Sequence, residues 1–347
     1  MKIFASSDCA MKAKEVKQRR WARPPEDERL RFLADIAAFY FHDGLTQSEI
    51  GQLIGVSTAM VSRFLAEARQ KGLVQINIQY PFELDPDLQT ELVRRFNLRT
   101  ARVVVVGVDD SLRSRLMQVG QVTARLIHTL LNDNSIITVG WGNTIYEVVK
   151  AMPPTTKTGI RVVQASGTLG GTASPTDNFH ITQALAARLN GQSYHLHAPM
   201  IVSSREIRDS LYQEPSIAEV MALARRADIM LKGLGVPYPE HSNLFKAGFL
   251  DAETLASFRE EGSVGDLGAH NIDIYGVPCA VGLAERVIGM SIEDSKHAKH
   301  SILPVIGTFK SAAIVGALRT GCLTTLVTDH ITAQEVIKIS DQYPLPG

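Results

Sequence analysis

Residues 46–68, TQSEIGQLIGVSTAMVSRFLAEA, are the most constraining segment of this chain, because their pattern predicts two short helices joined by a tight turn. Thr46 and Glu49 have the T-x-x-E spacing of a capping box at the start of the first helix. Gly55 lies where that helix must end, a position that favours a residue free to take positive φ. Ser57 can cap the second helix. This arrangement is typical of a helix-turn-helix.

The two predicted helices separate apolar from polar residues. The inward face of the pair carries Ile50, Leu53, Ile54, Val61, Phe64, Leu65 and Ala68. The start of the second helix presents outward Ser57, Thr58, Ala59, Ser62 and Arg63. In a helix-turn-helix these residues meet base edges in the major groove, where small side chains permit close approach and arginine can bind guanine or phosphate. The alternative is an ordinary helical hairpin within a larger bundle.

The surroundings of this motif predict a domain over residues 28–80. A helix is expected over residues 28–41, and alternating apolar residues over 74–78 predict a strand, as in the winged form of the motif. Residues 1–27 are polar and basic and contain two adjacent prolines, which predicts a flexible tail. The tail could contact DNA as a basic arm or have no specific role.

Composition describes a globular protein with two domains. The chain has 347 residues, 45% hydrophobic and 21% charged, and domains usually contain about 100–200 residues. Net charge is zero, but residues 1–80 carry 12 Lys or Arg against 9 Asp or Glu, so the positive excess lies beside the predicted DNA-binding motif. The chain has three widely spaced cysteines, which is typical of a reducing cytoplasm. It has neither an apolar run long enough to span a membrane nor a signal-peptide pattern, so we expect a cytoplasmic protein without membrane contact.

The remainder of the chain predicts a doubly wound α/β domain over residues 101–347. A linker with a short helix is expected over 81–100, and the valine-rich run at 101–108 predicts a strand buried on both faces. From there, predicted strands and helices alternate to the end of the chain, as in a parallel sheet covered by helices. Ligands of such sheets bind at the carboxyl ends of the strands, so the loops after strands are the candidate sites.

Glycine-rich loops after the predicted strands form the candidate effector site. They contribute Gly142, Asn143 and Thr144 in one loop, Gly167 with Asn178 in a second, and Gly233 and Gly235 in a third. The first loop precedes a helix, where glycines let backbone N–H groups approach an anion and the helix dipole favours negative charge. A plain turn remains the alternative for the first and third loops, and a capping role is the favoured alternative for Asn178 in the second.

Asp266 and Lys310 complete the candidate site. Asp266 lies in a glycine-rich segment and could hold a sugar hydroxyl or simply form a turn. Lys310 precedes a helix, where its charge opposes the helix dipole unless an anion binds there. The histidine pairs lack neighbouring ligands at metal spacing, and no residues have a defensible catalytic spacing. We therefore expect no metal, no cofactor and no catalytic residues.

Four segments of the chain resemble the SorC group of bacterial transcriptional regulators, within the DeoR superfamily. They are LTQSEIGQLIGVSTAMVSRFLAEARQKGLVQI, VGWGNTIYEVVKAMPP, VGDLGAH and VIGTFKSAAIVGALRTGCLTTLVTDHITA. The resemblance covers nearly all of the chain from about Leu30 onward. The resemblance implies a DNA-binding domain followed by an effector domain similar to sugar-phosphate isomerases and deaminases. It also implies a cytoplasmic dimer or tetramer whose affinity for DNA is controlled by a sugar or phosphorylated sugar.

The resemblance places Gly142, Asn143 and Thr144 at the effector phosphate, with Asp266 and Lys310 in the same pocket. The family often has arginine where this chain has Asn143, so a free sugar or a polyol remains an alternative effector. The resulting hypothesis is a ligand-responsive regulator of a carbohydrate operon, with repression as the expected sense. The competing hypothesis is a sugar-phosphate enzyme with an accessory DNA-binding module, because fold alone does not determine function.

Overall fold

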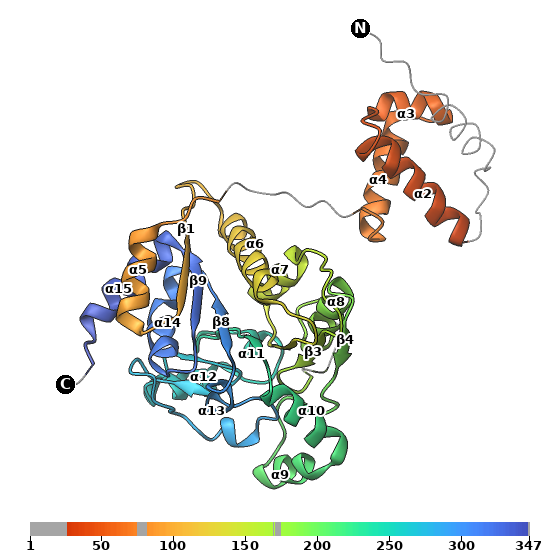
Figure 1. Cartoon of the computed structure of the whole chain (residues 1–347). Helices are drawn as coiled ribbons and strands as arrows, with labels where there is room; N and C mark the ends of the chain where they lie inside the picture. Colours follow the sequence, from red (N-terminus) through yellow and green to blue (C-terminus); the bar gives the residue numbers. More distant parts are fainter. Residues whose placement is uncertain (1–25, 75–81, 169, 171–174, 346–347) are drawn as a thin grey trace. The chain divides into compact units, whose positions relative to one another are not determined.

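The computed structural model describes residues 26–74, 82–168, 170 and 175–345. The chain divides into two compact units, Met1–Gln79 and Tyr80–Gly347, which are considered separately (Figure 1). Residues 1–25 of the predicted basic tail and residues 75–78 of the predicted wing strand lie outside the described residues.

The described residues of the first unit form α2 (Glu26–Phe41), α3 (Gln47–Ile54) and α4 (Thr58–Gln70). The helix-turn-helix prediction is confirmed in its local detail. Glu49 N–H donates to Thr46 Oγ1 (3.2 Å), Thr46 N–H donates to Glu49 Oε2 (2.9 Å), and Gly55 ends α3 with a φ of 80°. Helix α2 begins two residues earlier than predicted, because three acidic residues in its first turn complement the helix dipole.

The core of this unit is small and apolar. Its buried members are Leu33, Ile36, Ala37, Phe39, Ile50, Ile54, Val61, Phe64, Leu65 and Ala68, and Leu53 packs against them. All seven residues predicted for the inward face of the motif therefore lie in or against this core. The spacing of apolar residues was sufficient to identify this face.

Gly51 allows the turn of the motif to fold tightly against α3. A Cβ added at this position would lie 2.7 Å from the carbonyl oxygen of Val56, so the turn would have to shift. We expect Gly51→Ala to lower the free energy of unfolding of the first unit by about 1–3 kcal/mol, despite the better helix propensity of alanine. Urea denaturation followed by circular dichroism measures this change. Gln52→Ala, at the exposed neighbouring position of α3, is the control, and equal stability of the two variants would contradict the prediction.

In the described part of the second unit, seven parallel strands form one sheet in the order β1-β9-β8-β5-β2-β3-β4. The strands are β1 (Thr100–Val104), β2 (Ile136–Val139), β3 (Arg161–Gln164), β4 (Gln192–Tyr194), β5 (Ile229–Leu231), β8 (His300–Pro304) and β9 (Thr325–Asp329). A separate antiparallel pair consists of β6 (Gly265–Asp266) and β7 (Asn271–Ile272). The predicted α/β fold with a parallel sheet is confirmed.

Helices cover both faces of this sheet (Figure 1). One face packs against α6 (Leu112–Leu130), α7 (Asn143–Ala151) and α8 (Asn178–Arg188). The other packs against α5 (Pro86–Phe96), α10 (Pro215–Arg225), α14 (Ser311–Arg319) and α15 (His330–Gln342). Leu92 of α5 is fully buried in this second layer, so the α/β unit begins before residue 101.

Short elements were the part that sequence patterns did not predict. They are α9 (Arg205–Gln213), α11 (Asn243–Lys246), α13 (Ile292–Ser295), η1 (Ala284–Arg286), η2 (Thr308–Lys310), β6 and β7. In contrast, α12 (Ala252–Glu260) agrees with the helix that the sequence pattern predicts over residues 251–261. Strand β1 is also shorter than the predicted 101–108, because Val105 N–H donates to the carbonyl oxygen of Glu83 instead of continuing along β9. None of the described helices is both long and apolar enough to cross a membrane.

Strand order reverses between β2 and β5, which places a crevice at their carboxyl ends. The chain runs outward from β2 through β3 to β4, and then returns to β5 on the other side of β2. In open α/β sheets such a reversal is where ligands bind. The loops that follow β2 and β5 contain Gly142 and Gly233, two of the residues predicted to bind the effector.

Candidate effector site and DNA-binding surface

The loops after β2 and β5 meet closely at the crevice. Gly140 N–H donates to the carbonyl oxygen of Leu231 (2.8 Å), and a Cβ on Gly233 would lie 2.8 Å from the carbonyl oxygen of Trp141. Glycine at 233 is therefore required for backbone contact between the loops. Two adjoining cavities open beside this contact, an inner one and an outer one, and they share Trp141, Gly233, Leu234 and Asn243.

The outer cavity lies at the N-terminus of α7 and is lined by Gly142, Asn143 and Thr144. Gly142 occupies the N-cap position with a φ of 110°, and no side chain caps the helix. The N–H groups of a first helical turn have no partner within the helix, so here they remain available to a ligand. The geometry suits a phosphate or another anion, as the glycine-rich sequence predicts.

Two lysines face the same outer cavity. Lys310 Nζ donates to the carbonyl oxygen of Leu234 (2.8 Å), and Lys246 from α11 lines the same cavity. Burial lowers the pKa of Lys310 to about 8, although the negative charge of Asp266 acts in the opposite direction. Lys310 forms the N-cap of α14, so its charge is unfavourable both through desolvation and through the helix dipole. A bound anion would relieve both costs.

Asp266 belongs to the inner cavity and lies in β6, not in the turn that its glycine neighbours suggested. Its Oδ1 accepts a hydrogen bond from Ala269 N–H (2.8 Å). Burial raises the pKa of Asp266, while the hydrogen bond from Ala269 and the charge of Lys310 lower it. A Cβ on Gly235 would lie 1.9 Å from Asp266 Oδ2, so glycine at 235 makes room for the carboxyl group.

Asn178 and Gly167 have structural surroundings that differ from the expected ligand contact. Asp177 is the N-cap of α8, with its side chain accepting from Phe179 N–H (2.8 Å), so the suggested capping role of Asn178 is wrong. Asn178 is fully buried and donates through Nδ2 to Ser166 Oγ (2.6 Å) and to the carbonyl oxygen of Gly167 (3.0 Å). Among the described residues, neither Asn178 nor Gly167 lines the two cavities; Ser166, which Asn178 holds, does.

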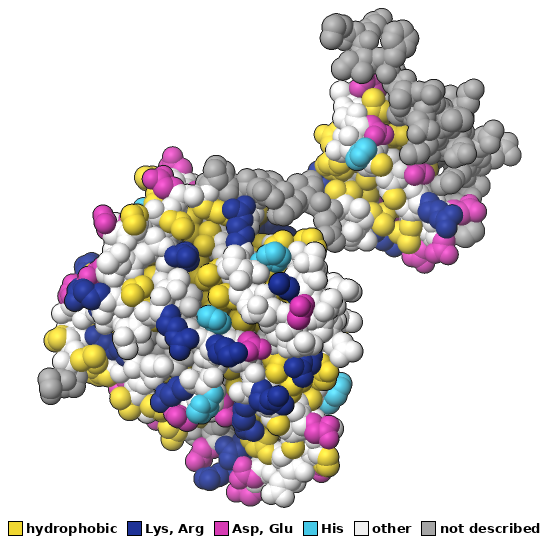
Figure 2. Space-filling model, viewed as in Figure 1, with side chains coloured by type: hydrophobic (Ala, Val, Ile, Leu, Met, Phe, Trp, Pro, Cys, Tyr) yellow, Lys and Arg dark blue, Asp and Glu magenta, His cyan; other side chains and the backbone are white. Residues whose placement is uncertain are grey.

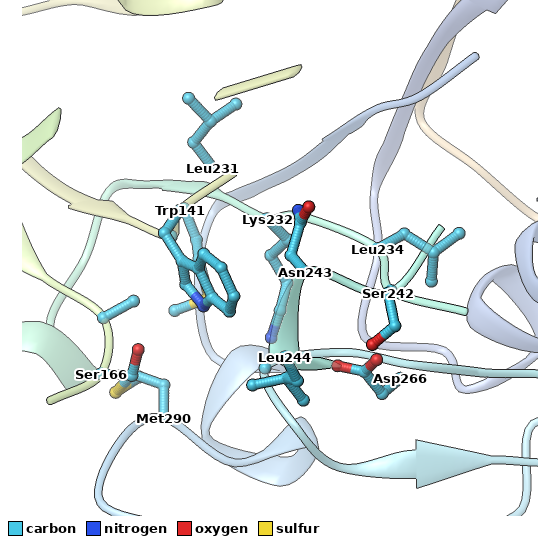
Figure 3. A pocket seen from close by; sticks show the side chains of 16 residues that line it. Trp141, Ser166, Leu231, Lys232, Leu234, Ser242, Asn243, Leu244, Asp266 and Met290 are labelled. Atoms are coloured by element: carbon cyan, nitrogen blue, oxygen red, sulfur yellow. The ribbon is translucent and has the colours of Figure 1, made fainter. Parts of the chain in front are cut away.

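Several cavity residues had no signal in the sequence pattern. Beyond the predicted set, the two cavities are lined by the side chains of Trp141, Ser166, Lys232, His241, Ser242, Asn243, Lys246 and Phe309, among others. Figure 3 labels ten of the inner-cavity side chains, which come from segments far apart along the chain. Lys232 directly follows β5, and its position at the carboxyl end of a central strand was the one available clue.

The charge on the visible face of the second unit is unevenly distributed. Lys and Arg side chains lie across the middle of this face, and most Asp and Glu side chains lie nearer its margin (Figure 2). Within the described ranges, no group of three or more His, Cys, Asp and Glu residues could hold a metal ion. The positive centre of the face favours an anionic ligand over a cation.

The start of α4 presents the residues predicted to contact DNA. Ser57, Thr58, Ala59, Ser62 and Arg63 are all exposed, and Ser57 Oγ caps the helix by accepting from Met60 N–H (3.3 Å). The remaining helix face is buried in the core of the first unit. A helix presented in this way can enter a major groove with its N-terminal residues against the bases.

Comparison with known proteins decides the family. Residues 80–338 match the family described as "Putative sugar-binding domain". The chain belongs to this family. It is 27% identical over 312 residues to the deoxyribonucleoside regulator of Bacillus subtilis, covering 89% of this chain and 98% of the relative. It is 26% identical over 315 residues to the sorbitol operon regulator of Klebsiella pneumoniae, covering 89% of this chain and 98% of the relative.

The fold agrees with a solved structure over both units of the chain. The crystal structure of the full-length sorbitol operon regulator SorC from Klebsiella pneumoniae matches 91% of this chain and 100% of its own, with a TM-score of 0.69 and 24% identity. Together with the family match and the regulators among the relatives, this confirms the resemblance to SorC-type transcriptional regulators that the sequence motifs carry. This sugar-binding family member is a transcriptional regulator in which a helix-turn-helix unit precedes the α/β unit.

Proposed function

We propose that this regulator binds operator DNA through the start of α4 and that a phosphorylated sugar in the crevice controls its affinity for DNA. One observation carries the proposal for the effector. An α7 N-terminus without a side-chain cap, Lys310 and Lys246 all line one cavity. Backbone N–H groups at a helix start bind phosphate oxygens, and the two ammonium groups balance the phosphate charge.

The rest of the site would recognise the sugar. Asp266 lines the inner cavity, where its carboxylate oxygens can accept hydrogen bonds from ligand hydroxyl groups. Asn243 and Ser242 line the same inner wall. Effector binding to one arrangement of the α/β unit shifts the population that is competent to bind DNA. We propose that the regulator represses transcription and that effector binding relieves this repression.

The DNA-binding part of the proposal is tested with Arg63. Arg63→Ala should weaken binding to the operator about 10- to 100-fold, because a bidentate arginine–guanine contact contributes roughly 1–3 kcal/mol of discrimination. Fluorescence anisotropy on the chain's own upstream DNA, against random DNA of equal length, measures both affinity and specificity. Arg31→Ala, which removes an exposed charge from α2, should have a smaller effect and leave specificity intact. Unchanged operator specificity in Arg63→Ala would refute the assignment of this residue.

We also propose that the regulator acts as a homo-oligomer in the cytoplasm. The reason is geometric, since two recognition helices spaced by a helical turn of DNA read a palindromic operator. Sedimentation with and without operator DNA measures the oligomeric state.

The competing hypothesis, turnover of a sugar phosphate, is not our proposal. The relatives in this family are named as transcriptional regulators. We propose that the site binds its effector without converting it, and recovery of unchanged effector after long incubation with the protein tests this directly.

A further inference from the structure

Lys232 is a third lysine of the crevice, and the proposed phosphate site does not use it. It directly follows β5 and lines the inner cavity with Ser166, Met290 and Gly268. Its side chain is only 8% exposed. Figure 3 shows it extending between Trp141 and Asp266 into the group of side chains that surrounds the cavity.

The ammonium group of Lys232 lacks a negatively charged partner. Among the described residues, its one hydrogen bond goes to Ser295 Oγ, which in turn donates to the carbonyl oxygen of Ser291 (2.7 Å). The nearest carboxylate that influences it, Asp294, is already paired with Arg225 Nε (2.9 Å). A buried lysine without a counter-charge is costly unless a ligand supplies one.

The electrostatic surroundings of Lys232 are consistent with a ligand role. Burial lowers the pKa of Lys232, while the charges of Cys322 and Asp294 raise it. Burial also lowers the pKa of His270, and the positive charge of Lys232 acts in the same direction. An anion placed beside Lys232 would restore its ordinary pKa and strengthen the attraction.

The two cavities differ in size and in charge. The outer cavity, with Lys310, Lys246 and the helix start, has a volume of about 200 Å³, and the inner cavity has a volume of about 70 Å³. The inner cavity offers one ammonium group, from Lys232, and two hydroxyl groups that can donate to a ligand, from Ser166 and Ser242, whose oxygens accept from Asn178 Nδ2 and Phe245 N–H. Such a set fits a singly charged, planar group better than a phosphate.

We propose that the effector is a phosphorylated sugar acid whose carboxylate binds Lys232 in the inner cavity while its phosphate occupies the outer cavity. This inference rests on the proposed function and specifies its effector class. The hydroxyl groups between the two charged ends then lie beside Asn243, which lines both cavities, and Asp266, which lines the inner one.

The experiment compares ligands that differ only at the end opposite the phosphate. Calorimetric titration of the full chain uses phosphorylated aldonates of four to six carbons, each with the matching alditol phosphate and aldose phosphate. We expect the best aldonate phosphate to bind about 10- to 100-fold more tightly than its alditol partner, the range of a charge-assisted hydrogen bond. Lys232→Met should abolish this preference, and Lys232→Arg should restore part of it.

Ser295→Ala separates a ligand role from a structural one. This variant removes the hydrogen-bond partner of Lys232 and leaves the ammonium group in place. If Lys232 binds the carboxylate, Ser295→Ala keeps the preference for aldonate phosphates. If Lys232 only anchors α13, the two variants lose stability alike and neither alters ligand preference, which overturns the proposal.

Other outcomes would overturn the proposal of a sugar-acid effector and leave the proposed function, control by a phosphorylated effector, intact. Equal binding of aldonate and alditol phosphates, or absence of binding by every aldonate phosphate, refutes a carboxylate at Lys232. Preference for an aldose phosphate with an adduct trapped by borohydride would assign the lysine to an aldehyde instead. In each case, phosphate-dependent binding that is lost in Lys310→Ala would still support the effector site. Absence of any phosphate dependence would refute both proposals.

Discussion

Replacing Lys310 by alanine is expected to weaken binding of a phosphorylated effector roughly 10- to 150-fold, because hydrogen bonds to charged groups contribute about 1.5–3 kcal/mol. Lys310 is held at the outer cavity by the carbonyl oxygen of Leu234, beside the uncapped N-terminus of α7. The variant removes a charge that burial makes unfavourable in the free protein, so we expect no loss of stability. Effector affinity and stability should therefore change independently.

Calorimetry and thermal unfolding of the same variant separate these two effects. Lys150→Ala is the matched control, since this lysine lies at the exposed far end of α7. It should bind the effector as the parent chain does. Binding of a phosphorylated ligand that is equal in Lys310→Ala and Lys150→Ala would place the phosphate elsewhere.

The lowered pKa of Lys310 adds a pH dependence to effector binding. Its pKa of about 8 lies below the ordinary value of 10.5, so the free protein loses this charge as the pH rises through 8. Effector affinity should fall between about pH 7 and pH 9, and Lys310→Ala should flatten this part of the profile. In the absence of effector, the free energy of unfolding should change in the opposite direction and rise with pH. The unfolded chain binds more protons between pH 8 and 10.5, so Lys310 makes the free protein more stable as pH rises through that window.

Replacing Arg115 by methionine is expected to destabilise the α/β unit by about 3–5 kcal/mol, the cost of removing one partner from a buried ion pair. Arg115 of α6 binds Asp329 with Nη2 2.8 Å from Oδ1 and Nε 3.2 Å from Oδ2. Asp329 is fully buried at the end of β9 and caps α15 by accepting from Thr332 N–H (2.8 Å). Without Arg115, the negative charge of Asp329 would remain buried with no positively charged partner in contact with it among the described residues.

Chemical denaturation of the parent chain and the variant measures this loss, which corresponds to a fall in Tm of roughly 10 °C for a unit of this size. Arg113→Met is the control, because Arg113 lies on the same helix and is exposed. Adding Asp329→Asn to Arg115→Met should recover part of the stability, since asparagine can still cap α15 and carries no charge. A change below about 1 kcal/mol in Arg115→Met would show that the pair contributes little.

Local sequence was sufficient for the helix-turn-helix. Capping residues, a glycine at the turn and apolar spacing act over a few residues, and Thr46, Glu49, Gly55 and Ser57 have the predicted roles. The alternation of strands and helices in the second unit was predictable for the same reason, because buried strands and amphipathic helices have distinct periods. Short elements such as α11 and β6 were not, since they contain too few residues to show a period.

The residues of the candidate site likewise fall into those that local sequence predicts and those that only the tertiary structure reveals. Glycine loops at strand ends and a lysine before a helix are visible in the sequence, and this identified Gly142, Gly233 and Lys310. The sequence could not indicate that Gly235 makes room for Asp266, because these residues lie 31 positions apart and meet only through pairing of the β6 segment with the loop after β5. Nor could it distinguish Asn178 as a buried support of Ser166 from Asn178 as a helix cap.

The amino-acid sequence by itself therefore determined the order of the two units, the exposed helix face that we propose contacts DNA, and the loops that line the candidate effector site. These features depend on interactions between near neighbours along the chain. Packing in three dimensions was needed to bury Lys232 without a carboxylate partner and to bring Lys246 and Lys310 to one cavity. The burial of a side chain and the identity of its hydrogen-bond and ion-pair partners depend on segments far apart in the sequence. The charges that would select the effector therefore became apparent only in the folded structure, where the sheet brings those segments together.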